Sequence, residues 1–121
     1  MNFKENKPIY IQISDRIADD VLSGALKPDE RIPSVRECAA TVEVNANTVV
    51  RSYDFLQQKG VIYNRRGLGY FVSPDAKEIV TNMRLESLLG EELTQVMRQL
   101  ASIGVTPDEL QRLYADFLKK Q

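Results

Sequence analysis

Ser34-Val35-Arg36-Glu37 and Asn45-Ala46-Asn47-Thr48 are the two segments that decide the fold, because each carries the signal for the start of a helix. In the first segment, the Ser34 hydroxyl can accept the backbone N–H of Glu37 while the Glu37 carboxylate reaches back, which is a capping box. In the second, Asn45 is a favourable N-cap. Residues 42–44 leave room only for a tight turn between the two helices. The pattern therefore predicts a helix-turn-helix.

The residues after the second helix predict a basic β-hairpin. Val61-Ile62-Tyr63-Asn64 and Tyr70-Phe71-Val72 are short β-prone runs, and Arg65-Arg66-Gly67-Leu68-Gly69 between them is a turn with two arginines. The stub Arg31-Ile32-Pro33 can contribute only a short strand, because proline has no backbone donor. We expect this stub to pair with the hairpin, as in a winged helix.

Two apolar stripes complete the predicted core. Residues 8–23 predict a helix, because Ile9, Ile13, Ile17 and Val21 recur four residues apart and Gly24 follows as a helix end. In the helix expected over residues 46–59, an advance of about 100° per residue separates two faces. The apolar face holds Val49, Tyr53 and Leu56, and the polar face holds Asn47, Arg51, Asp54 and Gln58.

Three motifs in this region also resemble a known family. Arg31-Ile32-Pro33-Ser34-Val35-Arg36-Glu37, Val44-Asn45-Ala46-Asn47-Thr48-Val49 and Arg65-Arg66-Gly67-Leu68-Gly69-Tyr70-Phe71-Val72 look like the GntR family of bacterial transcriptional regulators. The Asn-x-Asn-Thr-Val segment fits the YtrA-type subfamily best. The resemblance spans residues 8–74 in register. It implies a winged helix-turn-helix that binds double-stranded operator DNA and acts as a repressor.

Composition excludes several classes of function. The chain has no histidine and one cysteine, which excludes Cys/His zinc fingers, histidine acid–base catalysis and an internal disulfide. Carboxylate chemistry is not excluded by composition, but Asp15, Asp19 and Asp20 are expected on the solvated face of a helix. We therefore expect no enzymatic activity, no catalytic residue, no metal and no cofactor. No apolar run approaches the length of a membrane span, and no charged-then-apolar leader opens the chain, so we expect a cytoplasmic protein.

Charge is distributed unevenly along the chain. The formal net charge is −1, but residues 31–72 carry six basic and three acidic side chains, a local charge of +3. Residues 76–121 carry six basic and seven acidic side chains. A basic patch of this size predicts moderate DNA affinity for one chain and favours a dimer that presents two patches.

The chain changes character after residue 74. We expect residues 1–74 to form the winged domain and residues 75–121 to form a two-helix arm. The first arm helix is expected to end at Gly104, and the second to begin at Thr106-Pro107-Asp108-Glu109, another capping box. Such an αα-hairpin is too small to bury its apolar stripes alone, so we expect it to dimerise, with packing on its own winged domain as the alternative. The expected interface residues are Leu85, Leu89, Leu93, Val96, Leu100, Leu113 and Phe117.

The fold class that follows is α+β and mainly helical, a winged helix-turn-helix followed by a helical dimerisation arm. Within it, Asn47, Thr48 and Arg51 are predicted to read bases or nearby phosphates. Ser34, Arg36 and Asn45 are predicted to fix the DNA backbone. The predicted wing residues are Arg65, Arg66, Gly67 and Gly69.

Some alternatives remain open from the sequence. The rival function is a winged-helix module that binds a protein through the arm and does not bind DNA. Cys38 is interpreted as a small core residue, with a redox sensor as the alternative. The tail is too short for a large ligand-binding domain. Any small-molecule effector is therefore expected at the dimer seam or between the arm and the winged domain.

Overall fold

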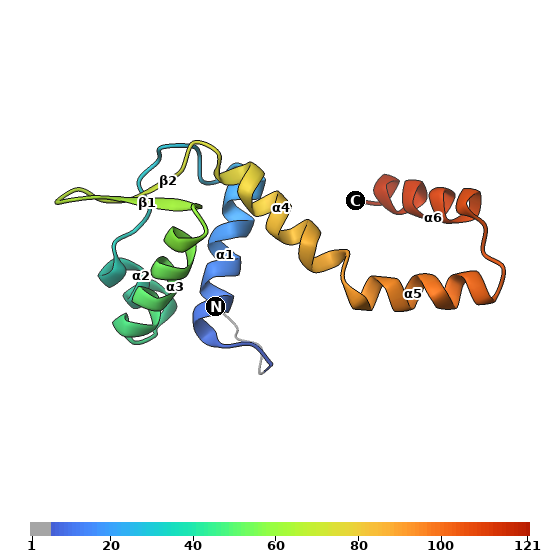
Figure 1. Ribbon diagram of the computed structural model, residues 1–121. Coiled ribbons are helices and arrows are strands. Elements are labelled where there is room, and N and C mark those ends of the chain that lie inside the picture. Colours follow the sequence, from blue (N-terminus) through green and yellow to red (C-terminus); the bar gives the residue numbers. More distant parts are fainter. Residues whose placement is uncertain (1–5) are drawn as a thin grey trace. The chain divides into compact units, whose positions relative to one another are not determined.

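A computed structural model describes residues 6–121, so the first five residues of the expected winged domain lie outside the described part. The described residues form six helices and one two-stranded sheet, which confirms the predicted mainly helical α+β class (Figure 1). The elements follow the chain in the order α1 (Ile9–Ser23), α2 (Val35–Val42), α3 (Ala46–Gln58), β1 (Ile62–Arg65), β2 (Gly69–Val72), α4 (Ala76–Leu88), α5 (Glu91–Ser102) and α6 (Pro107–Lys119).

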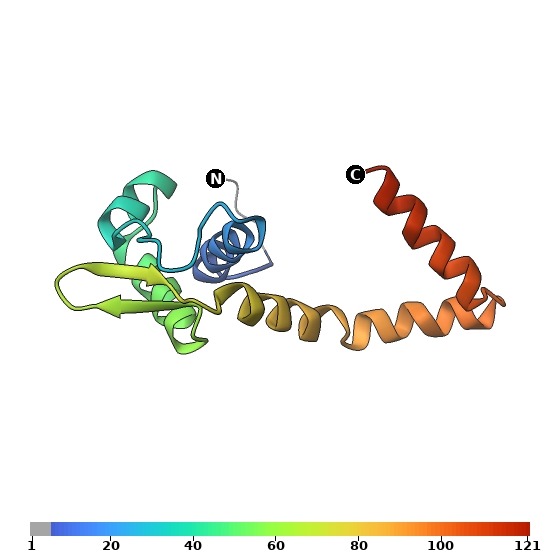
Figure 2. The same ribbon diagram turned by 90° about the horizontal axis from the view of Figure 1, so that it is seen from above.

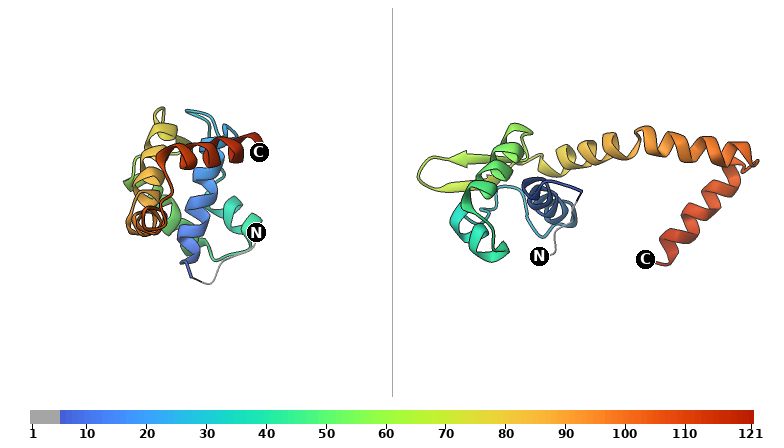
Figure 3. Two further views of the ribbon diagram at one scale, coloured as in Figure 1. Left: turned by 90° about the vertical axis from the view of Figure 1, so that its right-hand side faces the viewer. Right: turned by 90° about the horizontal axis from the view of Figure 1, so that it is seen from below.

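Helix α1 packs against α3 (Figure 3). Ile13, Ile17 and Val21 are buried, whereas Ile9 is 42% exposed, so the stripe is shorter than its spacing predicts. Ile9 is the first residue of the helix and lies at the edge of the core. The helix ends at Gly24, whose φ of +86° places it in the left-handed region that glycine adopts without a steric penalty.

The two helix starts are formed as predicted. Ser34 accepts the Glu37 backbone N–H at 3.1 Å, and Glu37 Oε1 accepts the Ser34 backbone N–H at 3.1 Å. Asn45 Oδ1 accepts the backbone N–H of Asn47 at 2.8 Å and caps α3. Between the helices the chain turns at Glu43, which has a φ of +57°. The Ser34–Glu37 bonds thus fix the start of α2, and the Asn45 cap fixes the end of the tight turn where α3 begins.

The hairpin is antiparallel, with Ile62 opposite Val72 and Arg65 opposite Gly69. It projects from the rest of the winged unit with its loop at the free end (Figure 2). The predicted pairing with the stub is present. Arg31 forms a bridge with Phe71, and the Ile32 N–H donates to the Tyr70 carbonyl oxygen at 3.0 Å. The stub therefore fixes the hairpin along its second strand.

Helix α4 begins inside the core of the winged unit. Ala76 and Val80 are each 1% exposed and belong to the same buried cluster as the side chains of α1, α3 and the hairpin. The chain accordingly divides into one compact unit that ends at Met83 and a second that runs from Arg84 to Gln121. The first turns of α4 thus lie in the winged unit, beyond the boundary that was placed at residue 74.

The prediction of a two-helix arm is wrong, because the chain breaks between α4 and α5 at Leu89 and Gly90. Gly90 caps α5, and Glu91 and Glu92 follow in its first turn, where acidic side chains interact favourably with the helix dipole. This Gly-Glu-Glu signal was present in the sequence, but the apolar spacing that continues across it concealed it. Leu85 and Leu93 therefore lie on different helices. The predicted capping box of Thr106 and Glu109 at the start of α6 is confirmed.

Candidate nucleic-acid interface

The outward face of α3 is polar at its N-terminal end. Asn47 and Arg51 are exposed on this face, with Asp54 a turn further along. The opposite face is closed, because Val49 and Tyr53 are fully buried against the other elements of the winged unit. The division of the helix surface therefore agrees with the 3.6-residue period of the sequence. Val50 is an exposed apolar side chain beside Asn47 that was not assigned from the sequence.

Two of the side chains that were predicted to fix the DNA backbone also cap helices. The side-chain oxygens of Ser34 and Asn45 accept backbone N–H groups at the starts of α2 and α3. Thr48 is half-buried, and its carbonyl oxygen accepts a hydrogen bond from the Ser52 hydroxyl at 3.3 Å. Arg36 is exposed on the first turn of α2. The two caps therefore order the first turn of each helix locally.

Arg51 is arranged by a contact that the sequence did not predict. Its guanidinium carbon lies over the Tyr10 ring, 4.2 Å from the ring centroid. Tyr10 belongs to the first turn of α1, so the contact joins two elements that are far apart in the chain. At this distance the guanidinium and the ring form a cation–π pair.

The wing presents arginines around a glycine-containing turn. The Leu68 N–H donates to the Arg65 carbonyl oxygen at 2.8 Å and closes the turn, in which Gly67 has a φ of +80°. The Arg65 guanidinium carbon lies 5.5 Å from the centroid of the Phe71 ring, and Arg66 is exposed. Glycine is required at position 67 because residues with a side chain rarely adopt this backbone conformation.

Arg31 joins this basic surface and was not among the predicted site residues. It is exposed on the strand stub, and its side chain lies against Gly69. A Cβ at Gly69 would lie 3.1 Å from Arg31 Nε, and the φ of Gly69 is +112°. Gly69 therefore gives room to the arginine and adopts a φ that a residue with a side chain rarely adopts. The sequence signal that could have identified Arg31 as a site residue was its basic side chain at the start of a stub expected to pair with the hairpin.

Tyr53 connects the helix-turn-helix to the wing. Its hydroxyl donates to the Pro33 carbonyl oxygen at 2.7 Å, and its ring packs edge-on against the Tyr70 ring at 5.0 Å between centroids. The half-buried thiol of Cys38 lies beside the Tyr53 hydroxyl, and burial raises the pKa of Cys38. A raised thiol pKa leaves little thiolate, which favours the packing role of Cys38 over redox sensing.

Residues 6–121 contain no group of three histidine, cysteine, aspartate or glutamate side chains that could hold a metal ion. None of the helices described is long and apolar enough to span a membrane.

Comparison with known proteins gives consistent matches. Residues 9–72 match the family described as "Bacterial regulatory proteins, gntR family". The repressor YtrA of Bacillus subtilis is 33% identical over 111 residues, which cover 92% of this chain and 82% of YtrA. A crystal structure of a GntR-family regulator from Bacteroides thetaiotaomicron has a TM-score of 0.78 and 47% identity, with 93% of this chain and 98% of that chain covered.

Some structural neighbours were solved with operator DNA. The DNA-binding domain of AraR in complex with operator ORR3 has a TM-score of 0.55 and 26% identity. The match covers 60% of this chain and 88% of the AraR domain. The match thus leaves about two fifths of this chain uncovered.

The capping box of α2 predicts a pH-dependent stability. Hydrogen bonds from the Ser34 backbone N–H and hydroxyl lower the pKa of Glu37 below its ordinary value of 4.5. A lowered folded-state pKa stabilises the fold above pH 4.5, and this contribution disappears as the pH falls through the folded-state pKa. Glu37→Ala should therefore be less stable than the parent to urea at neutral pH, and the difference should shrink in acid.

Glu86→Ala is the matched control, because Glu86 is an exposed carboxylate on α4 that takes no part in a cap. Its difference from the parent should change little over the same pH range. A Glu37→Ala difference that is equal in acid and at neutral pH would show that the carboxylate charge does not support the cap.

Proposed function

The chain belongs to the gntR family of bacterial regulatory proteins, which are DNA-binding transcription regulators, and from this premise we propose that it is a repressor that binds an inverted-repeat operator as a homodimer. The observation that carries the proposal is the exposed N-terminal end of α3, with Asn47 and Arg51 outward beside an arginine-bearing wing. A helix presented in this way fits the major groove of B-DNA.

Each part of the surface has a distinct proposed role. Asn47 and Arg51 read base edges, and Thr48 supports them or contacts a nearby phosphate. Arg36 contacts phosphate, while Ser34 and Asn45 hold the helix N-termini against the backbone. The wing, formed by Arg65, Arg66, Gly67 and Gly69, contacts phosphate or the adjacent minor groove. We add Arg31 to the phosphate-contacting set because it shares the wing surface.

The proposed dimer interface runs from the end of α4, through the break that follows it, to α5 and α6. Most apolar side chains of α5 and α6 are exposed in the single chain, such as Val96 at 49%, Leu113 at 61% and Phe117 at 57%. Exposed apolar surface of this extent is typical of an interaction site, and a second copy of the chain is the partner that needs no further assumption. The proposed interface residues remain Leu85, Leu89, Leu93, Val96, Leu100, Leu113 and Phe117.

The names of related proteins support the DNA-binding role over the rival protein-interaction module. YtrA is named a repressor, and the AraR domain was solved on an operator.

The proposal predicts a two-fold-symmetric DNA site. In a selection from random duplexes, the full-length protein should enrich an inverted repeat with half-sites about one helical turn apart. Affinity for the selected duplex should fall with salt, with a log–log slope of roughly −4 to −8, because each chain offers a few cationic contacts. Absence of enrichment, together with equal binding to scrambled DNA, would favour the rival protein-interaction module.

The exposed apolar side chains of the arm predict that the protein is a dimer. Light scattering of the parent should give twice the chain mass of 13.8 kDa, and Leu113→Glu with Phe117→Glu should give monomers. Ala115→Glu, on the opposite side of α6, is the control and should remain dimeric. Point substitutions are preferable to removal of residues 76–121, because that deletion would take Ala76 and Val80 from the winged core. A monomeric parent at micromolar concentration would contradict the proposal.

Base reading and backbone contact should separate in a matched pair of arginine variants. Arg51→Ala should cost ~1–3 kcal/mol on the operator and relax preference at one base pair, as expected for a lost bidentate base contact. Arg65→Ala should weaken binding to all duplexes by similar factors and reduce the salt slope. Unchanged selectivity in Arg51→Ala would show that α3 is oriented differently in the groove.

A further inference from the structure

We propose that Tyr10 is a positioning residue for DNA reading, because its ring holds the Arg51 guanidinium in the direction of the base edges. This inference rests on the proposed function, and it assigns a role in sequence recognition to α1, a helix that none of the predicted site residues occupies. The central observation is the distance of 4.2 Å between the guanidinium carbon of Arg51 and the centroid of the Tyr10 ring.

The ring is the contact that holds the Arg51 head group. Arg51 is exposed, and within residues 6–121 its guanidinium has neither a hydrogen bond nor an ion pair to another side chain. An arginine without such support samples many rotamers, and ordering it on DNA costs conformational entropy. An aromatic surface that favours one arrangement before binding lowers this cost.

Tyr10 is itself fixed to the recognition helix. Its carbonyl oxygen accepts hydrogen bonds from the hydroxyls of Ser14 at 2.8 Å and Ser52 at 2.7 Å. Ser52 directly follows Arg51 in α3 and is fully buried, so the anchor lies next to the residue that the ring supports. The Tyr10 ring also packs edge-on against the Phe55 ring, with 6.4 Å between centroids.

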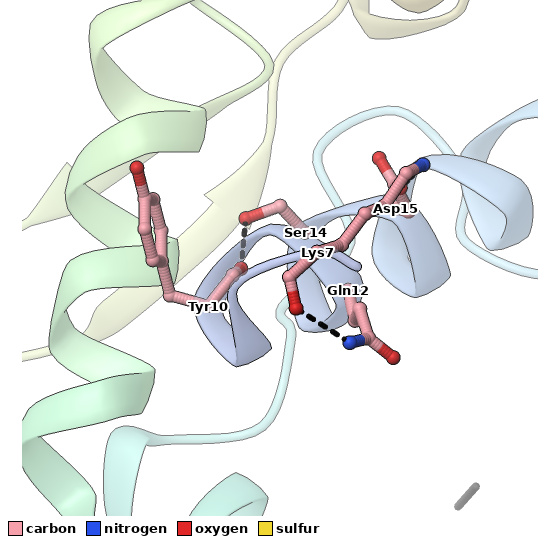
Figure 4. Close-up of polar contacts among 5 residues, drawn as sticks. All are labelled: Lys7, Tyr10, Gln12, Ser14 and Asp15. Atoms are coloured by element: carbon pink, nitrogen blue, oxygen red, sulfur yellow. Dashed lines mark hydrogen bonds and ion pairs between the residues drawn. The ribbon is translucent and has the colours of Figure 1, made fainter. Parts of the chain in front are cut away.

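Figure 4 shows the Tyr10 ring projecting from α1 on the side away from Gln12 and Lys7. The Gln12 side-chain amide donates a separate hydrogen bond to the Lys7 carbonyl oxygen at 2.9 Å. Lys7 also forms an ion pair with Asp15 at 3.1 Å. The start of α1 is therefore tied down on both sides of Tyr10, which gives the ring a defined place beneath Arg51.

Stacking is compatible with base recognition. The guanidinium is planar, and its five N–H donors point outward in its plane. When one face of the guanidinium rests on the Tyr10 ring, these donors stay available for the O6 and N7 acceptors of a guanine in the major groove. The ligand chemistry assigned to the Tyr10–Arg51 pair is therefore the Hoogsteen edge of a guanine.

The test uses the full-length protein and the duplex that the parent selects from a random library. The readout is the selectivity ratio, defined as the Kd for a duplex altered at the base pair read by Arg51 divided by the Kd for the selected duplex. Tyr10→Leu should lower this ratio about two- to five-fold, the range expected for an exposed cation–π pair. Its affinity for scrambled DNA should remain that of the parent.

Conservative variants separate stacking from packing. Tyr10→Phe should retain the parental ratio, because the ring face is kept. Progressively fluorinated phenylalanines at position 10 should lower the ratio in the order in which fluorine weakens the negative ring face, while the ring still fills the same site. In the background of Arg51→Ala, Tyr10→Leu should cause no further loss of selectivity.

Three results would overturn the positioning role while leaving the proposed function intact. The first is an unchanged ratio in Tyr10→Leu, the second is fluorinated rings that behave like phenylalanine, and the third is a Tyr10→Leu effect of equal size with and without Arg51. If the parent itself does not distinguish the selected duplex from scrambled DNA, the proposed function fails, and the positioning role fails with it.

Discussion

The hydrogen bond from the Tyr53 hydroxyl to the Pro33 carbonyl oxygen, together with the burial of the Tyr53 ring, is the constraint on which the winged unit depends. The ring is on α3, the carbonyl is on the strand stub, and the neighbouring Tyr70 ring is on β2. One side chain thus fixes the recognition helix, the stub and the wing to one another. A change in its position would move the polar face of α3 relative to the wing arginines.

The rest of the unit is built around that constraint. The helix α1 supplies apolar side chains beneath α3, and the start of α4 closes the same core with Ala76 and Val80. Local hydrogen bonds at the caps of α2 and α3 set the turn between them, and the stub sets the hairpin. The apolar contacts of the core are buried, whereas Asn47, Arg51 and the wing arginines lie on the outer surface. We therefore expect substitutions of Asn47 or Arg51 to alter DNA preference without loss of the fold.

The features predictable from the sequence were those that depend on local rules. Capping boxes involve residues three apart, and the apolar period of α3 identifies its buried face with no knowledge of the partners. The Gly90 break was missed because apolar spacing alone does not distinguish one long helix from two. The burial of Ala76 and Val80, the place of Arg31 beside Gly69 and the Tyr10–Arg51 pair could not be predicted, since each depends on which distant segments the tertiary structure brings together.

The most direct measurement of the central claim is a crystal structure of the full-length protein bound to its selected duplex. The account predicts two chains related by a two-fold axis, with the N-terminal end of each α3 in a major groove and Asn47 and Arg51 within hydrogen-bond distance of base edges. The loop of each hairpin should lie against the neighbouring backbone or minor groove. A complex in which DNA contacts another surface, with Asn47 and Arg51 facing solvent, would contradict the account.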